Sequence, residues 1–161
     1  MQNEMFEETK DENLDNNSWL STTKTVFKIA LIGAAGVGKT SILHRIGGMR
    51  FDPRYCPTVG YKQYVVDMLG VRLLITEYPG QERYQTVYDT NIDGILVVTT
   101  ASALDTRTAF EMMRKMPDNI PYCFVENKSD IRMKNLNMCC SVKTNHNLIA
   151  PFQDLLNQMQ S

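Results

Sequence analysis

The order of hydrophobic and polar positions along the chain predicts strands that alternate with helices. Three short apolar runs are typical of strands buried on both faces: Val26–Ile32, Gly94–Thr99 and Tyr122–Glu126. Two further runs rich in β-branched residues, Tyr61–Met68 and Val71–Glu77, are separated only by a Leu-Gly pair. This spacing predicts that the two runs form a hairpin.

Helices are expected between most of these strands. The pattern predicts helices at Lys39–Ile46 and Thr106–Lys115, and an apolar stripe at helical spacing predicts a last one at Ile149–Met159. A short sixth strand is expected at Met138–Ser141. The alternation indicates an α/β fold of three layers, whose six-stranded sheet is mostly parallel with one antiparallel edge strand. Ligands of such sheets bind at the carboxyl ends of the strands.

The first 25 residues differ from the rest in composition. They carry six acidic and two basic side chains and few apolar ones, so we expect an acidic, disordered N-terminal extension. Residues 26–161 are expected to form one globular domain. The formal net charge of −1 gives no bulk field toward a polyanion, so no direct nucleic-acid binding is expected.

Gly33–Thr40 fits the phosphate-binding pattern G-x-x-x-x-G-K-T, known as the P-loop. It follows an expected strand and opens an expected helix, which is the context that the pattern requires. Glycines permit a tight turn whose backbone N–H groups point at phosphate. We expect Lys39 to reach the β- and γ-phosphates and the Thr40 hydroxyl to bind Mg²⁺. Further nucleotide contacts are expected from Ala34, Ala35, Gly36, Val37, Gly38 and Ser41.

A second loop distinguishes guanine from adenine. Asn127-Lys128-Ser129-Asp130 follows the expected strand Tyr122–Glu126 and fits N-K-x-D. The Asp130 carboxylate can accept from N1–H and the N2 amino group of guanine together, and adenine lacks this pair of donors. A carboxylate buried against adenine would lose its partners, which is costly. The pattern therefore disfavours an ATPase or kinase, which the first loop alone would allow.

Together these motifs resemble those of the Ras superfamily of small GTPases, with most likeness to its Ran and Rab branches. The resemblance covers about residues 26–160. It implies that Phe51 packs on the guanine and that Tyr55 lies over the phosphates. Thr58, at the family's spacing after Lys39, would bind Mg²⁺ and the γ-phosphate.

The same resemblance implies a second switch segment that starts at Pro79. Gly80 N–H would contact the γ-phosphate, Gln81 would orient the attacking water, and Lys39 would stabilise the developing charge. Asn127 and Lys128 would bind the nucleotide beside Asp130. The tripeptide Ser141-Val142-Lys143 resembles the family's Ser-Ala-Lys base loop, with Val142 N–H available to guanine O6.

Several positions depart from the family pattern. Glu77 stands where the family has an aspartate that holds Mg²⁺ through water, and its longer side chain could coordinate the metal differently. Ala35 replaces a P-loop glycine of Ras, and Pro79 fixes φ before Gly80. Only ten residues separate Asp130 from Ser141, so we expect the family's helix there to be missing.

Two functions remain open at this point. The first is a GTP/GDP-binding switch with slow GTP hydrolysis, in which GTP holds two loops through Thr58 and Gly80 and hydrolysis releases them. The second is a hydrolysis-deficient binding module that occupies the partners of a complete GTPase, and the departures at Ala35, Glu77 and Pro79 favour it.

Partners and location follow as expectations. Protein regulators and effectors would bind through residues 51–62 and 78–92. The chain carries no prenylation or myristoylation signal, so no lipid anchor is expected. Its four cysteines show neither metal nor redox spacing, which is typical of reduced thiols. A cytoplasmic or nuclear monomer is therefore expected.

Overall fold

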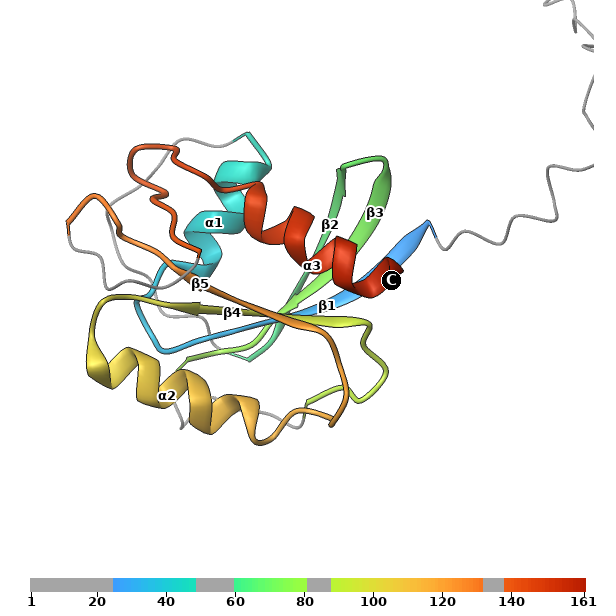
Figure 1. Cartoon of the computed structure of the whole chain (residues 1–161), viewed down its shortest axis with the longest axis horizontal. Coiled ribbons are helices and arrows are strands. Elements are labelled where there is room, and N and C mark those ends of the chain that lie inside the picture. The colour runs from blue at the N-terminus through green and yellow to red at the C-terminus, as the bar shows by residue number, and fades with distance from the viewer. Residues whose placement is uncertain (1–24, 49–59, 81–87, 132–137) are drawn as a thin grey trace, which may run out of the picture.

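The computed structural model describes residues 25–48, 60–80, 88–131 and 138–161. Within these ranges a five-stranded sheet lies between helices on both faces (Figure 1). Its order is β2-β3-β1-β4-β5, and only β2 and β3 pair antiparallel. This confirms the α/β fold with a mostly parallel sheet and one antiparallel edge strand. The strands are β1 (Val26–Ile32), β2 (Lys62–Met68), β3 (Val71–Glu77), β4 (Gly94–Thr99) and β5 (Tyr122–Glu126).

The hairpin between β2 and β3 fixes which residues of the two strands share a face. Leu69 and Gly70 both have positive φ, 54° and 76°, as a two-residue type I′ turn requires. The register therefore runs from Met68 opposite Val71 to Lys62 opposite Glu77. β2 begins one residue later than expected.

Three helices cover the sheet: α1 (Lys39–Ile46), α2 (Ala103–Met113) and α3 (Ala150–Gln160). α1 has the predicted bounds. α2 starts three residues before the predicted position because Ser102 caps it, with the Asp105 N–H donating to the Ser102 hydroxyl. α3 starts one residue late and carries Pro151 in its first turn, where no N–H donor is needed.

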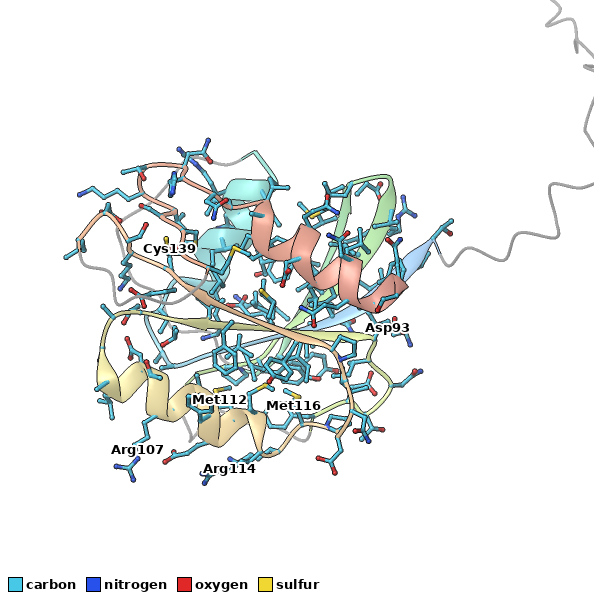
Figure 2. All side chains as sticks on the ribbon, in the orientation of Figure 1. Asp93, Arg107, Met112, Arg114, Met116 and Cys139 are labelled. Atoms are coloured by element: carbon cyan, nitrogen blue, oxygen red, sulfur yellow. The ribbon has the colours of Figure 1, made fainter. Side chains whose placement is uncertain are left out.

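The two faces of the sheet have separate apolar cores. α1 and α3 lie on one face, and Ile42 and Phe152 pack there with Ile29 and Leu31 of β1. α2 lies alone among the described helices on the other face, where Met112 joins a second cluster (Figure 1). Figure 2 shows Met112 and Met116 between α2 and the sheet, whereas Arg107 and Arg114 point away. The helices cover the two faces of the sheet, and the carboxyl ends of its parallel strands lie together at one edge.

The sixth strand expected at Met138–Ser141 is not formed, so that prediction was wrong. Residue 139 forms only an isolated parallel bridge to Glu126, closed by Cys140 N–H to Glu126 O at 2.8 Å. At Ser141 the chain turns back on itself and pairs with His146 instead, because the next residues form a loop. The described residues therefore hold five strands, not six.

Two other expectations concern residues outside the described ranges. No helix occurs in 127–131 or 138–149, but residues 132–137 between them are not described, so the missing helix stays a prediction. Residues 1–24 are likewise not described, and their disorder stays a prediction. Among the described helices, none is long and apolar enough to cross a membrane.

Candidate functional site

The loop between β1 and α1 folds around the Lys39 side chain. Lys39 Nζ donates to the carbonyl oxygens of Gly33 and Ala34, both at 2.9 Å. The side chain is only 6% exposed. Burial lowers the pKa of Lys39 to about 8, with Glu77 and then Asp105 opposing that shift. The loop thus holds a desolvated cation at the carboxyl edge of the sheet.

The start of α1 is open to an anion. Its N-cap is Gly38, at φ 101°, and no side chain among the described residues caps this helix. The first turn also contains no acidic residue. The N–H groups at a helix start carry partial positive charge and lack intrahelical acceptors. Together with Lys39, this arrangement is suited to bind phosphate.

Thr40 and Glu77 meet at this edge. The Thr40 hydroxyl donates to Glu77 Oε1 at 2.5 Å, and the Tyr64 hydroxyl donates to Glu77 Oε2 at 3.3 Å. Glu77 is 1% exposed. Burial and the Glu77 carboxylate raise the pKa of Tyr64 to about 12, so the phenol stays a donor.

The oxygens of Thr40 and Glu77 suit Mg²⁺, which prefers hard ligands and is bound by one or two carboxylates together with phosphates and water. A single buried carboxylate beside a phosphate-binding loop is such a set. Among the described residues, no three His, Cys, Asp or Glu side chains form a metal cluster. The remaining ligands would therefore be water and phosphate, or Thr58, which lies outside the described residues.

Gly80 packs directly against the P-loop. A Cβ atom on Gly80 would lie 2.2 Å from the backbone nitrogen of Ala35 and 2.4 Å from the carbonyl carbon of Ala34. Pro79 before it is buried. Since these neighbours are backbone atoms, they cannot give way to a side chain. Only glycine fits at this position.

Asn127 joins the second loop to the first. It is 2% exposed, and its Nδ2 donates to Val37 O at 2.8 Å. Its Oδ1 accepts from Val142 N–H at 3.2 Å and from the Cys140 thiol at 3.5 Å. Lys128 adds a second link, since its Nζ donates to Gly36 O at 2.8 Å. We call the Asn127 and Lys128 contacts to the P-loop the latch.

Asp130 and Ser141 form the outer part of the second loop. The Ser141 hydroxyl donates to Asp130 Oδ1 at 2.6 Å and accepts from Thr144 N–H at 3.2 Å. Ser141 and Val142 are buried, whereas Asp130 and Lys143 are exposed. The carboxylate is thus oriented at the surface beside the latch.

Sequence reasoning missed two contacts at this site. Tyr64 could have been found, because the hairpin register places it on the same face of the sheet as Glu77. No sequence signal marked Cys140; burial raises its pKa to about 12, so its thiol remains a donor to Asn127. Four predicted site residues lie outside the described ranges: Phe51, Tyr55, Thr58 and Gln81.

The structure brings the other predicted site residues to one edge of the sheet. A P-loop lies between β1 and α1, a buried acid ends β3, and an N-K-x-D loop follows β5 and is latched to the P-loop. The fold and this edge define the class: a P-loop α/β protein with the loop pattern of guanine-nucleotide binders.

Comparison with known proteins agrees with that class. The model of the Ras family matches residues 28–136, more than half of the chain. The chain therefore belongs to the Ras family of small GTPases, and the relatives below make it Rab-like. The likeness to the Ran branch stays a prediction.

Three relatives illustrate the match. The chain is 33% identical over 126 residues to the Ras-related protein Rab-7b of Paramecium octaurelia, covering 68% of this chain and 61% of that one. It is 35% identical over 104 residues to Rab-32C of Dictyostelium discoideum, covering 60% and 45%. It is 27% identical over 167 residues to Rab-18 of Caenorhabditis briggsae, covering 86% and 83%. The chain thus spans less than two thirds of the first two relatives.

Proposed function

We propose that this chain is a nucleotide switch, which binds GDP and GTP together with Mg²⁺ and hydrolyses GTP slowly. The observation that carries the proposal is the latch, because it holds a phosphate-binding loop and an N-K-x-D loop side by side. Each motif alone is weaker evidence, but two loops held together in this way can bind the phosphates and the base of a single nucleotide.

The chain's own groups divide the work of binding. The N–H groups of Gly33–Thr40 and the start of α1 bind the phosphates, and Lys39 supplies a positive charge that burial keeps unscreened. Asp130, held by Ser141, accepts from the two guanine donors. Val142 N–H donates to Asn127 Oδ1 in this structure, so it would have to exchange that acceptor for the base oxygen when guanine binds.

Thr40, Glu77 and Thr58 would hold Mg²⁺, which neutralises charge on the β- and γ-phosphate oxygens when bound. Gln81 orients the attacking water, and Gly80 N–H contacts the γ-phosphate. After hydrolysis Thr58 and Gly80 lose that contact, so the two loops that carry them are released. Ala35 adds a methyl group to the P-loop where an activating arginine would enter, so an activating protein would accelerate the reaction poorly while intrinsic hydrolysis survives.

A second function is favoured by one specific observation. Gly80 is packed against the Ala34–Ala35 backbone, and Pro79 before it is buried. A second switch segment anchored in this way would respond little to the γ-phosphate. The chain would then hold nucleotide without turnover and act by occupying the partners of a complete GTPase.

Partner binding through residues 51–62 and 78–92 is part of both proposals. The described portions of these segments support it, since Tyr61, Lys62 and the run 89–91 are exposed. Exposed side chains on the two segments that respond to nucleotide are what a regulator or effector would read.

Turnover measurements on the purified full chain separate the two functions. We expect Mg²⁺-dependent GTP hydrolysis that Gln81→Leu abolishes and that the exposed control Gln153→Leu leaves unchanged. Tight GDP and GTP binding without turnover would select the binding module. Turnover unaffected by Gln81→Leu would refute the role of Gln81, and absence of nucleotide binding would refute both functions.

A further inference from the structure

The Glu77 carboxylate is held from two different elements. Thr40 at the start of α1 donates to one oxygen, and Tyr64 in the middle of β2 donates to the other. Glu77 itself ends β3 and is buried. Its carboxylate therefore lies where a helix, an edge strand and a central strand meet.

The hairpin register explains how Tyr64 reaches Glu77. Lys62 lies directly opposite Glu77, and Tyr64 lies opposite Ile75, so Tyr64 and Glu77 are diagonal neighbours on one face. Diagonal neighbours are too far apart for short side chains but within reach of an aromatic one. The length of the Tyr64 side chain thus bridges the diagonal distance between the two residues.

The ring is also fixed from the helix side. His44 lies one turn after Thr40 on α1, and its ring meets the Tyr64 ring edge-on, with centroids 6.4 Å apart and planes at 65°. Tyr64 is partly buried there against the core beneath α1. The ring that carries the hydroxyl to Glu77 is therefore contacted both by α1 and by the core.

A glutamate needs such a support more than an aspartate would. It has one more rotatable bond, so fixing its carboxylate loses more side-chain entropy. A hydrogen bond to each oxygen restricts that extra torsion. We propose that Tyr64 is a positioning residue, which holds the Glu77 carboxylate toward Thr40 and so sets the Mg²⁺ affinity of the nucleotide complex. This inference rests on the proposed function.

The first test measures metal affinity through nucleotide release. The full chain is loaded with a fluorescent GDP analogue, and its dissociation rate is followed over a range of buffered free Mg²⁺. Tyr64→Phe keeps the ring and removes the hydroxyl, and we expect the Mg²⁺ midpoint to rise about threefold to tenfold. Tyr122→Phe is the control, because Tyr122 is half exposed on β5, where its ring packs on Phe124.

A second pair of variants separates positioning from a general weakening. Glu77→Asp shortens the acid beyond the reach of Tyr64, so adding Tyr64→Phe to it should change the midpoint no further. Equal midpoints for Tyr64→Phe and Tyr122→Phe would overturn the inference. A Tyr64→Phe effect of undiminished size in the Glu77→Asp background would overturn it as well.

A third measurement does not depend on nucleotide. In metal-free protein, the free energy of unfolding is measured for Tyr64→Phe, Glu77→Gln and the double variant. The single effects should be non-additive, and strict additivity would overturn the inference. If the native chain shows no Mg²⁺-dependent GDP retention, the proposed function fails, while this cycle still decides whether Tyr64 holds Glu77.

Discussion

The site has a phosphate half, with Lys39 and Glu77, and a base half, with Lys128 and Asp130. Each half thus contains a lysine and an acid, but in opposite environments. Lys39 and Glu77 are buried, whereas Lys128 and Asp130 are exposed. Buried charges must be matched by partners in the fold itself, and here two carbonyls, a hydroxyl and a phenol provide them. The fold itself therefore supplies hydrogen-bond partners for the charged groups of the phosphate half. The base half is held in place by the latch.

The departures from the family pattern also divide unequally. Ala35, Glu77 and Pro79 belong to the phosphate half, beside the expected metal and the γ-phosphate, whereas the expected loss of the helix after Asp130 lies beside the base half. The base half keeps all the defining residues of N-K-x-D. The comparison suggests that guanine recognition is the retained property of the chain, and that metal handling and hydrolysis are the properties open to change.

The largest expected effect comes from breaking the latch between the halves. Gly38→Ala would place a Cβ 2.3 Å from Asn127 Nδ2, whose amide is held by several hydrogen bonds. We expect a loss of about 3 kcal/mol or more in the free energy of unfolding, and GDP binding weakened at least about 100-fold. Thermal and denaturant unfolding with a GDP titration measure both.

The matched control for Gly38 is Gly48→Ala. Gly48 also has positive φ, 88° against 101°, but no atom of the described residues beyond its chain neighbours lies within 4 Å of its Cβ position. Backbone strain is common to both variants and costs about 1 kcal/mol. Equal destabilisation of the two variants would contradict the claim that the Asn127 contact matters.

The next largest effect lies in the base half alone. Asp130→Asn replaces a carboxylate by an amide, so GDP binding should weaken about 100-fold. Xanthosine diphosphate, which has a carbonyl where guanine has its amino group, should bind the variant better than it binds the native chain. Competition binding measures this, with the exposed Asp118→Asn as control. An unchanged order of preference would refute the assigned role of Asp130.

A smaller effect is expected from pH in the phosphate half. Because burial lowers the pKa of Lys39 to about 8, the folded chain loses this proton at a lower pH than the unfolded chain does. This lysine therefore makes stability rise with pH between about 8 and 10.5, while phosphate binding falls as the proton is lost. GDP affinity should drop about fourfold from about pH 7 to pH 8.5.

Lys39→Arg checks that assignment. A guanidinium stays protonated throughout this range, so the variant should bind GDP with little pH dependence, whatever its absolute affinity. The same fourfold drop in the variant would show that another group is responsible.

The smallest effect lies far from both halves. Leu69 occupies the first position of the type I′ turn at φ 54°, a conformation that asparagine adopts more readily. Leu69→Asn should raise the free energy of unfolding by about 0.5–1 kcal/mol and leave GDP affinity unchanged. Leu104→Asn, at an exposed helix position, should bring no such gain. Destabilisation by Leu69→Asn would contradict the turn geometry.

The elements were predictable where the pattern is local. The strand Val26–Ile32 and the helix Lys39–Ile46 have their predicted bounds, because a buried run followed by a glycine loop leaves little alternative. Met138–Ser141 misled, because this run forms only one isolated bridge to Glu126 before the chain turns back and pairs Ser141 with His146. Where the chain stops running beside β5 is decided by this local turn, which hydropathy does not encode.

The two motifs of the site were predictable, but the contacts that join them into one site were not. Spacing alone identified Lys39, Thr40, Asn127 and Asp130 as residues of interest. The latch joins backbone carbonyls of Gly36 and Val37 to side chains some 90 residues away, and only the sheet order brings these together. The Tyr64 contact, by contrast, follows from the hairpin register that the two-residue Leu69-Gly70 turn sets, so it could have been predicted.

The central claim is that one ligand spans both halves. Calorimetric titration of the purified chain with GDP, GTP and ATP, each with Mg²⁺, tests it most directly. The account predicts saturable binding of both guanine nucleotides, with ATP at least about 100-fold weaker because adenine lacks the pair of donors that Asp130 accepts from in guanine. No binding of GDP or GTP, or equal binding of ATP, would contradict it.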